Sequence, residues 1–600
     1  MLDELIQLTI LDEESPQSFK VRAYEKAKAA LENHPEDFTS LSVSQLTKIP
    51  GVGKATATKV RELLDAGSVA KLETLRAQYP PEFARLSRIP GLGPKTLKLV
   101  RGQLGVEDLD GLKAAIDAQQ LRTLPRMGAT SEAKIGRAIE RLGLTGKHDR
   151  APAADAFPVA EQVAAALRAL PSVTDVLVCG SLRRMAETVG DVDITVAATE
   201  PTKVLPTIGE QPSKLGVEVR EVLAAGDTKM SVLTAGGLQI DIRVVDPSHF
   251  GATTLYFTGS KAHNVALRQR AIDRGLLLNE YGLSPASDPQ PTGVPQPEQP
   301  TQTPPTSSAL AASTEAEIYA ALDLAYIPAP MREATGEVEA AADGTLPTVV
   351  QRRDIRGDLH YHTDRSGDGR SSLADMVAEA ASHQLEYLAI TDHGEDLAIN
   401  GSNRLEMLAH RDAIRQLQPQ YPAMTLLYGC ELNIGPEGGL DYDAEFRASF
   451  DYTVASVHSH FDLPVRAQTA RMVAAIADPT VDSIGHLTGR YIGRRPGIEI
   501  DIDIVLEALY RFDVALEING SLHRLDAGAD VVRRAVRRGV KLVINTDSHH
   551  TSELGRMEYG VLTAQRGWAP RDLVINTWPR DRFLRWVNTH RTATKEHLTP

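Results

Sequence analysis

The nine residues GDVDITVAA at 190–198 decide the fold of the middle of this chain. Apolar residues alternate with others along the run, which predicts a β-strand. Asp191 and Asp193 are two positions apart, so their side chains project from one face of that strand. Two carboxylates this close repel each other unless a cation lies between them. The stretch therefore predicts a metal site on a β-sheet.

A third carboxylate and a glycine turn belong to the same prediction. In LQIDIRVV at 238–245 the apolar residues occupy one face of a strand and Asp241 the other. The apolar run VLVC at 176–179 ends at Gly180 and Ser181, where a turn offers backbone N–H groups to a phosphate, and Arg184 follows closely. Three carboxylates on neighbouring strands suit two Mg²⁺ or Mn²⁺ ions that clamp a transferring phosphoryl group.

Residues 1 to about 337 resemble the family X DNA polymerases, the group that includes polymerase beta. The resemblance rests on CGSLRR at 179–184, GDVD at 190–193 and YFTGSKAHN at 256–264. It implies a nucleotidyltransferase palm followed by a thumb, with three catalytic metal ligands: Asp191, Asp193 and Asp241. It also implies a set of residues that bind the incoming nucleotide, exclude its ribose 2′-OH or bond the minor-groove edge: Gly180, Ser181, Arg184, Tyr256, Phe257, Gly259 and Asn264.

Two residues depart from the vertebrate members of that family. Lys261 stands where those members carry an acid, and Gln239 stands where they carry an arginine beside the third carboxylate. Both positions would affect nucleotide affinity and catalytic rate. They are the sequence support for an alternative function, a DNA-end-binding nuclease or scaffold with weak polymerase activity.

The amino-terminal part carries two similar turns, IPGVGK at 49–54 and IPGLGPK at 89–95. Each lies between helix-like segments, and the first amides of the second helix would point at an anion. These are helix-hairpin-helix signatures, which bind DNA phosphates without reading sequence. Residues 51–150 also hold 18 Lys and Arg against 11 Asp and Glu, in a chain of net charge −14. The predicted DNA contacts are Gly51, Gly53, Lys54, Gly91, Gly93 and Lys95.

By the same resemblance, the amino-terminal domain corresponds to one that removes 5′-deoxyribose phosphate through a lysine Schiff base. Alignment on the first turn assigns the nucleophile to Lys59, with Lys20 and Tyr24 in support. Lys59 could instead be one more phosphate contact on the helix after the hairpin. Both roles stay open at this point.

After residue 350, apolar strand-like runs repeatedly end in His, Asp or Glu, with helix-like segments between them. Strands that alternate with helices and carry polar groups at their ends predict an α/β barrel whose site faces the carboxyl ends of the strands. Mixed imidazole and carboxylate ligands suit Mn²⁺, Zn²⁺ or Fe²⁺ better than Mg²⁺. The candidate ligands are His360, His362, Asp368, His393, Glu431, His458, His486, Asp547 and His549.

Residues 353 to about 570 resemble the polymerase and histidinol phosphatase (PHP) domain. That resemblance implies a distorted barrel with up to three metal ions, in which Glu431 bridges two of them. In polymerases of this architecture it implies a 3′→5′ exonuclease or 3′-end processing activity. A small-molecule phosphomonoesterase would fit the nine ligands alone, but it would leave the hairpins and GDVD unexplained.

The chain is therefore expected to be a multidomain α+β and α/β DNA repair polymerase with a second, hydrolytic site. Its expected partners are gapped or nicked DNA, dNTPs and repair proteins. Two cysteines, no membrane-length apolar run and an acidic start favour a cytoplasmic protein. It is expected to be a monomer associated with the nucleoid. The expected parts are a lyase-like helical domain 1–80, a fingers-like domain 81–150, the palm 151–250, the thumb 251–337 with a Pro-rich insertion 286–312, a linker 338–352, the PHP domain 353–575 and a tail 576–600.

Overall fold

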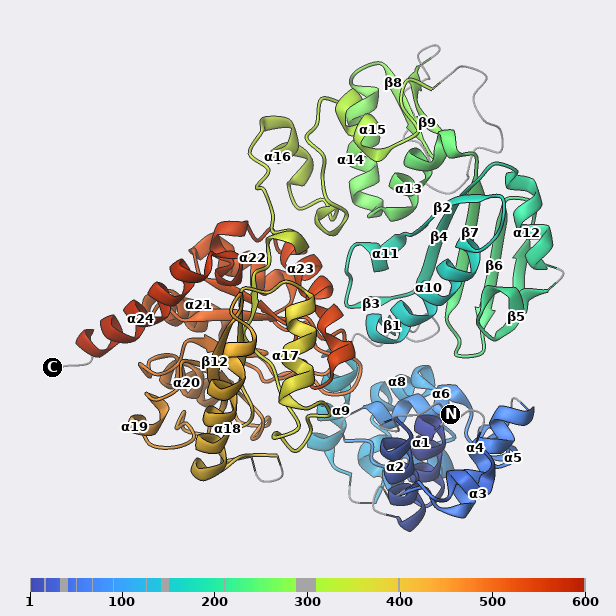
Figure 1. Ribbon diagram of the computed structural model, residues 1–600. Coiled ribbons are helices and arrows are strands. Elements are labelled where there is room, and N and C mark those ends of the chain that lie inside the picture. The colour runs from blue at the N-terminus through green and yellow to red at the C-terminus, as the bar shows by residue number, and fades with distance from the viewer. Residues whose placement is uncertain are drawn as a thin grey trace. The chain divides into compact units, whose positions relative to one another are not determined.

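The computed structural model describes residues 2–15, 18–32, 41–49, 51–66, 68–89, 91–125, 127–141, 150–209, 211–286, 309–397 and 400–597. The chain forms two compact units, Met1–Arg150 with Tyr491–Pro496, and Ala151–Arg490 with Gly497–Pro600. Figure 1 shows the first as helices and the second as two parts with large sheets, separated along the chain by a mainly helical region that also holds two short strands. Most of the predicted Pro-rich insertion lies outside the described residues.

The first unit is helical. One hydrophobic core, from Leu5 to Ile139, joins the two parts predicted at 1–80 and 81–150, and a smaller core forms around Leu46. At both predicted hairpins a glycine with positive φ makes the turn, Gly51 at 100° and Gly91 at 94°. The helices are α1 Leu2–Asp12, α2 Phe19–Glu32, α3 Val43–Leu46, α4 Lys54–Ala66, α5 Ala70–Gln78, α6 Pro81–Arg85, α7 Pro94–Leu104, α8 Leu109–Asp117 and α9 Ala129–Arg141.

The palm is a five-stranded sheet in the order β2-β4-β7-β6-β5. Its apolar face packs on α10 Ala153–Arg168 and α12 Pro201–Gly209. The strand predicted at 190–198 is confirmed as β4, which pairs in parallel with β7. The strands are β2 Val173–Val178, β4 Asp191–Ala198, β5 Val219–Ala225, β6 Lys229–Thr234 and β7 Gln239–Val245, and α11 Gly180–Arg183 follows β2.

The thumb has its own core, which includes Leu267, Tyr319 and Ile327. The segment predicted as a linker, 338–352, is packed rather than free: Val349 belongs to the thumb core and Val350 to the core of the barrel. The thumb elements are α13 Phe250–Thr258, α14 Lys261–Ile272, β8 Leu276–Asn279, β9 Gly282–Pro285, α15 Glu315–Ala321 and α16 Glu337–Asp343.

The carboxy-terminal domain is the predicted α/β barrel. Seven parallel strands follow chain order: β10 Gly357–Asp358, β11 Tyr387–Ile390, β12 Thr425–Asn433, β13 Tyr452–Ser456, β14 Ser483–Ile484, β15 Ala515–Asn519 and β16 Leu542–Asn545. A parallel bridge between Tyr361 and Ser548 brings the two edge strands together. The strands are buried on both faces, as parallel strands covered by helices must be.

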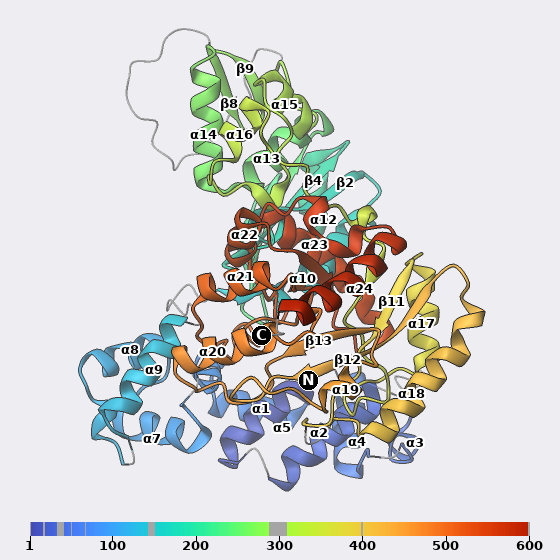
Figure 2. The ribbon, with the colours of Figure 1, turned by 90° about the vertical axis from the view of Figure 1, so that its left-hand side faces the viewer.

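Helices connect the barrel strands, and Figure 2 shows α17 and α18 beside β11 and β12. The helices are α17 Leu373–Ser382, α18 Arg404–Leu417, α19 Ala444–Arg447, α20 Val465–Ile476, α21 Ile502–Arg511, α22 Ala529–Arg538 and α23 Met557–Arg566. The predicted tail forms α24 Arg580–His597, whose Phe583 packs against Tyr387. Among the described residues, no helix combines the length and apolar character of a membrane span.

Candidate metal centres of the palm and the barrel

The three predicted carboxylates of the palm lie on adjacent strands. Asp193 on β4 is directly opposite Asp241 on β7, and Asp191 is opposite Gln239. The Gln239 amide donates to Asp241 Oδ2 at 2.9 Å, and the Ser231 hydroxyl donates to the other oxygen of Asp241. The sheet therefore brings the three acids together as the alternation of GDVD predicted.

The glycine turn approaches these acids closely. A Cβ on Gly180 would lie 2.3 Å from Asp193 Oδ2, and the residue has a φ of +63°. No side chain fits there, so only glycine lets the amino end of α11 approach the carboxylate. This contact explains why GS and GDVD occur together.

A cavity of about 220 Å³ opens on the palm carboxylates. Asp193 and Asp241 line it together with two cations, Lys229 and Arg243, and the ring of Phe257. The Arg243 guanidinium stands 4.9 Å from the centre of that ring. The cavity thus combines metal-binding oxygens, positive charge and an aromatic surface, which are the groups that a nucleoside triphosphate with its metal ions requires.

The pKa of Asp193 is raised to about 7, first by burial and then by Asp191 and Asp241. Below that pH a divalent cation has to displace a proton from the site. We expect Mn²⁺ affinity at this site to fall about tenfold per pH unit below pH 7 and to level off above it. Calorimetric titration across that range, on the wild type and on Asp193→Asn, would measure the dependence. A flat wild-type profile would contradict it.

The two arginines of GSLRR are held by acids of the thumb. Arg183 contacts Glu315 at 2.6 and 3.0 Å, and Arg332 contacts the same carboxylate at 2.9 and 2.8 Å. Arg184 Nε lies 2.8 Å from Glu333 and its guanidinium also donates to the Thr258 carbonyl. The sequence predicted Arg184 as a triphosphate contact, whereas here its guanidinium holds the palm to the thumb.

Neutralising Glu315 should strongly destabilise the palm–thumb contact. Although burial opposes ionisation, Arg332 and Arg183 hold the pKa of Glu315 far below its usual value of 4.5. The ionised carboxylate therefore stabilises the fold fully above about pH 4.5, and this stabilisation is lost as the pH falls toward the lowered pKa. Glu315→Gln leaves two guanidinium groups against an uncharged amide, and we expect a loss of about 3–5 kcal/mol. Thermal unfolding followed by circular dichroism would measure it. Glu339→Gln, an exposed change on α16, should be neutral, and an unchanged midpoint for Glu315→Gln would contradict the argument.

The other predicted nucleotide contacts lie on α11, α13, α14 and the turn between α13 and α14. Phe257 lines the cavity, and a Cβ on Gly259 would lie 3.3 Å from Arg184 Nη1. Asn264 donates to the Tyr256 carbonyl at 2.7 Å and so links α14 to α13. Ser181 lies in α11 beside Gly180, and Lys261 is exposed at the first position of α14.

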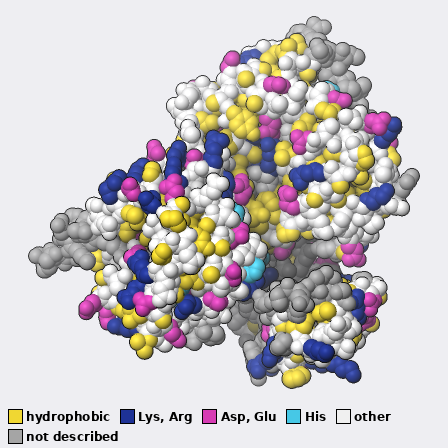
Figure 3. All heavy atoms as spheres, in the orientation of Figure 1, with side chains coloured by type: hydrophobic (Ala, Val, Ile, Leu, Met, Phe, Trp, Pro, Cys, Tyr) yellow, Lys and Arg dark blue, Asp and Glu magenta, His cyan; other side chains and the backbone are white. Residues whose placement is uncertain are grey.

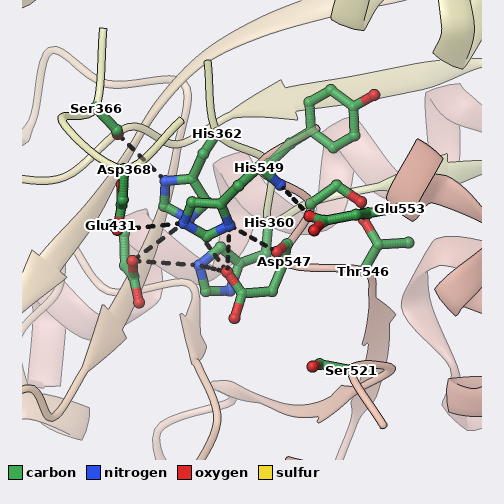
Figure 4. Close-up of polar contacts among 12 residues, drawn as sticks. His360, His362, Ser366, Asp368, Glu431, Ser521, Thr546, Asp547, His549 and Glu553 are labelled. Carbon is green, nitrogen blue, oxygen red and sulfur yellow. Dashed lines mark hydrogen bonds and ion pairs between the residues drawn. The ribbon is translucent and has the colours of Figure 1, made fainter. Parts of the chain in front are cut away.

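The nine predicted ligands of the barrel converge at the carboxyl ends of its strands. Figure 4 shows part of this set: His360, His362, Asp368, Glu431, Asp547 and His549. Four overlapping groups have ligand atoms within 4.8 Å of one another: His362, His393 and His549; His360, Glu431 and His486; His360, His362 and Asp547; and His393, Glu431 and His458. The ninth residue, Asp368, lies 3.3 Å from His393 and 3.5 Å from His549. Each of the nine therefore lies within reach of a shared centre.

The polar atoms of this cage fit metal ions. Both carboxylate oxygens of Glu431 are buried, as are His360 Nε2, His362 Nε2 and His393 Nδ1. None of these five atoms has a hydrogen-bond partner among the residues that the structure describes. Although burial opposes ionisation, the surrounding histidines hold the pKa of Glu431 well below its usual range. Buried, ionised oxygens and unbonded ring nitrogens that point at one another are the arrangement that a bound cation stabilises.

Glu517 and Asp392 support the cage, and both were missed by the sequence prediction. Glu517 accepts from His360 Nδ1 at 2.7 Å and from the His486 backbone N–H at 2.9 Å. Such a carboxylate fixes the orientation of a ligand histidine. The sequence signal was weak, because Glu517 lies in the middle of the strand-like run ALEIN at 515–519, which ends in Asn519.

The barrel also makes ion pairs with the palm and thumb. Arg490 contacts Glu187 of the palm at 2.7 and 3.1 Å and donates to the backbone carbonyl of Arg524. The guanidinium of Arg524 in turn lies 3.6 Å from Asp547. Arg566 contacts Glu333 at 2.5 Å and the Arg184 carbonyl at 2.8 Å. Figure 3 shows Lys and Arg side chains lying among Asp and Glu on this face of the molecule.

The predicted DNA contacts of the first unit lie where the sequence placed them, at the two turns. Val52 N–H donates to Ile49 and Leu92 N–H donates to Ile89, both at 3.0 Å, so the turns share one geometry. Gly53, Lys54, Gly93 and Lys95 are exposed, and Gly51 and Gly91 supply the positive φ.

Lys59 lies on α4 and is partly exposed. Its ammonium donates to the Ala55 carbonyl at 3.2 Å and stands 5.7 Å from the centre of the Tyr24 ring. Lys20 instead pairs with Glu13 at 2.5 Å. Of the two residues expected to support Lys59, only Tyr24 contacts it.

Five family models match the chain. They are described as a helix-hairpin-helix domain (residues 1–69), a SAM-like helix-hairpin-helix tandem (83–141), DNA polymerase beta palm (150–244), DNA polymerase beta thumb (253–333) and PHP domain (358–521). These ranges cover most of the two units.

Whole proteins are similar as well. The chain is 35% identical to the DNA polymerase/3′-5′ exonuclease PolX of Bacillus subtilis (strain 168) over 93% of each chain. It is 29% identical to a probable phosphatase of Acetivibrio thermocellus, over 37% of this chain and 90% of that protein. A probable phosphatase of Thermoanaerobacter sp. (strain X514) is also 29% identical, over 37% of this chain and 89% of that protein.

Proposed function

Because this chain belongs to the family X DNA polymerases that carry a PHP domain, we propose that it extends DNA primers at the palm and shortens 3′ ends at the barrel. The observation that carries the proposal is the presence of two separate clusters of metal-binding side chains in one chain. One is built from carboxylates on β4 and β7, and the other mainly from histidines at the ends of barrel strands.

At the palm, Asp191, Asp193 and Asp241 would hold Mg²⁺ or Mn²⁺, which supplies charge stabilisation for phosphoryl transfer. The other residues of the site would position the nucleotide and its metal ions. Gly180 lets the α11 amides approach the site, and Lys229 and Arg243 place positive charge in the same cavity. The aromatic side chain of Phe257 forms a wall against which a sugar and base can rest.

At the barrel, the nine ligands would hold up to three ions of Mn²⁺, Zn²⁺ or Fe²⁺, which supply Lewis acidity for phosphodiester hydrolysis. The Glu431 carboxylate lies within 3.5 Å of ring nitrogens of five histidines, with His393 at 2.8 Å and His486 at 3.0 Å. This position suits a role as a bridge between metal ions. Glu517 orients His360, and Asp392 orients Ser366 and His410. Arg524, beside Asp547, is placed to contact a phosphate oxygen.

The proposed substrates are gapped or nicked DNA and dNTPs, in base excision or end-joining repair, and the place of action is the nucleoid in the cytoplasm. The exposed hairpin turns at 51–54 and 91–95 would contact the DNA backbone. For Lys59 the contacts with Ala55 and Tyr24 are compatible with a phosphate contact and with a Schiff base. Borohydride trapping on DNA that carries a 5′-deoxyribose phosphate would decide between them, since a covalent adduct lost in Lys59→Ala would establish the lyase.

A denaturing gel of a 5′-labelled primer in a one-nucleotide gap, with Mn²⁺, tests the main proposal. Primer extension with dNTP and primer shortening without it are expected. Shortening alone would favour the alternative of an end-processing nuclease with weak polymerase activity. Release of inorganic phosphate from a sugar phosphate, without either change to the primer, would favour a small-molecule phosphatase and overturn the proposal.

A further inference from the structure

A second cavity, of about 300 Å³, lies beside the metal cage of the barrel. Its lining includes Arg365, Asn400, Ser402, Glu406 and His410. The size is at the lower end of the range for small-molecule sites, which runs from about 300 to 1,000 Å³. None of these side chains belongs to the nine predicted ligands.

One wall of the cavity is a buried histidine with an unused nitrogen. His410 is 2% exposed, and its Nδ1 lies 3.0 Å from Asp392 Oδ2. With the Nδ1 proton directed at this carboxylate, Nε2 is left as the acceptor of the ring. Nε2, on the opposite side of the ring, has no hydrogen-bond partner within the described ranges. A buried acceptor of this kind normally has a partner, which points to a ligand.

The walls of the cavity are fixed to residues of the metal cage. Ser366 connects His362 to Asp392, with contacts of 3.3 and 2.8 Å, and it also accepts from the His393 backbone N–H. Ser402 N–H donates to the His393 carbonyl at 3.0 Å. The loops that present His362, Asp368 and His393 are thus the loops that shape the cavity, so a molecule bound there lies directly beside the metal centre.

The chemistry of the lining is that of a nucleotide site. Arg365 is exposed and forms no ion pair in the part of the chain that the structure describes, so it can contact a phosphate. Asn400, Ser402 and His410 Nε2 provide neutral donors and acceptors for a base or sugar. The Glu406 carboxylate would repel a small inorganic anion bound inside the cavity. It can instead accept a hydrogen bond from an amino or hydroxyl group of a nucleotide.

We propose that this cavity binds the 3′-terminal nucleotide of the strand that the barrel shortens, with the phosphate toward Arg365. The inference rests on the proposed exonuclease activity and assigns its substrate-binding residues. The nucleoside 5′-monophosphate released by each hydrolysis has the same chemistry, and so it should bind the same cavity as a competitive inhibitor.

The test compares a substrate that fills the cavity with one that does not. Full-length wild type, Arg365→Ala and Asn400→Ala are assayed with Mn²⁺ on a 5′-labelled primer and on bis(4-nitrophenyl) phosphate, a diester without a nucleoside. We expect kcat/KM for trimming to fall at least about tenfold, the loss expected for one charge-assisted hydrogen bond. Hydrolysis of the small diester should change less than about twofold in Asn400→Ala, because that diester has no base or sugar for Asn400 to contact. Arg365→Ala should slow both substrates, because both carry the phosphate. Arg585→Ala, an exposed change on α24, is the matched control.

Binding of thymidine 5′-monophosphate to the Mn²⁺-loaded protein, measured by calorimetry, tests the cavity independently of catalysis. It should weaken by a similar factor in Arg365→Ala while metal content stays unchanged. Trimming at the wild-type rate in both variants, equal loss on both substrates in Asn400→Ala, or no binding of the monophosphate would overturn the inference. A wild type that binds the monophosphate but does not trim DNA would instead overturn the proposed function.

Discussion

Asp193→Ala abolishes nucleotide addition, with a loss of at least about 10³-fold, and leaves 3′ trimming at the wild-type rate. Asp193 is opposite Asp241 in the register of β4 and β7, and its Oδ2 also lies against Gly180. The carboxylate therefore belongs to the metal site and also contacts the Gly180–Ser181 turn. Without it the remaining acids, Asp191 and Asp241, cannot hold two cations in one geometry.

The measurement is single-nucleotide insertion into gapped DNA, paired with trimming of the same labelled primer in the absence of dNTP. Asp227→Ala, an exposed change between β5 and β6, serves as the control because it alters the charge of the same sheet by the same amount. If folded Asp193→Ala lost trimming as well, the two-centre proposal would be falsified.

His360→Ala has the opposite effect: trimming is lost by at least about 10³-fold and nucleotide addition is retained. His360 belongs to two of the four ligand groups, with Nε2 at 3.4 Å from Glu431 and 3.6 Å from Asp547. Its other nitrogen is held by Glu517 at 2.7 Å, so its removal also leaves that buried carboxylate without its main partner.

Metal content should change together with activity. Mass spectrometry of dialysed protein is expected to show fewer bound transition-metal ions in His360→Ala than in the wild type. His383→Ala is the matched control, because His383 is exposed directly after α17 and its ring contacts Glu379, which is not one of the nine ligands, at 3.2 Å. Full metal content together with full trimming in His360→Ala would remove this residue from the proposed site.

The sequence predicted the parts of both sites that depend on local periodicity. Asp193 and Asp241 face each other because a strand alternates its side chains, and Glu431 reaches the barrel centre because parallel strands end at one rim. Such placements need no knowledge of distant partners. Glu517 was missed because it lies inside β15, two residues before the strand ends.

Contacts between distant segments could not be predicted in this way. Glu315 lies 132 residues from Arg183, and only the folded thumb brings them together. Val349 and Val350 read as part of a linker, but they pack into two different cores. The cavity at His410 likewise depends on two loops and a helix that meet in space, so no run of sequence marks it.

The ion pairs between the barrel and the polymerase part have a consequence for dissection of the chain. A fragment that ended near residue 337 would remove the counter-ions that Arg490 supplies to Glu187 and Arg566 to Glu333. Trp568, which packs against the thumb core and lies 3.3 Å below the Arg533 guanidinium, would be removed as well. The domains are therefore distinct in sequence but not interchangeable modules, and a transplanted PHP domain would need matching acids on its new host.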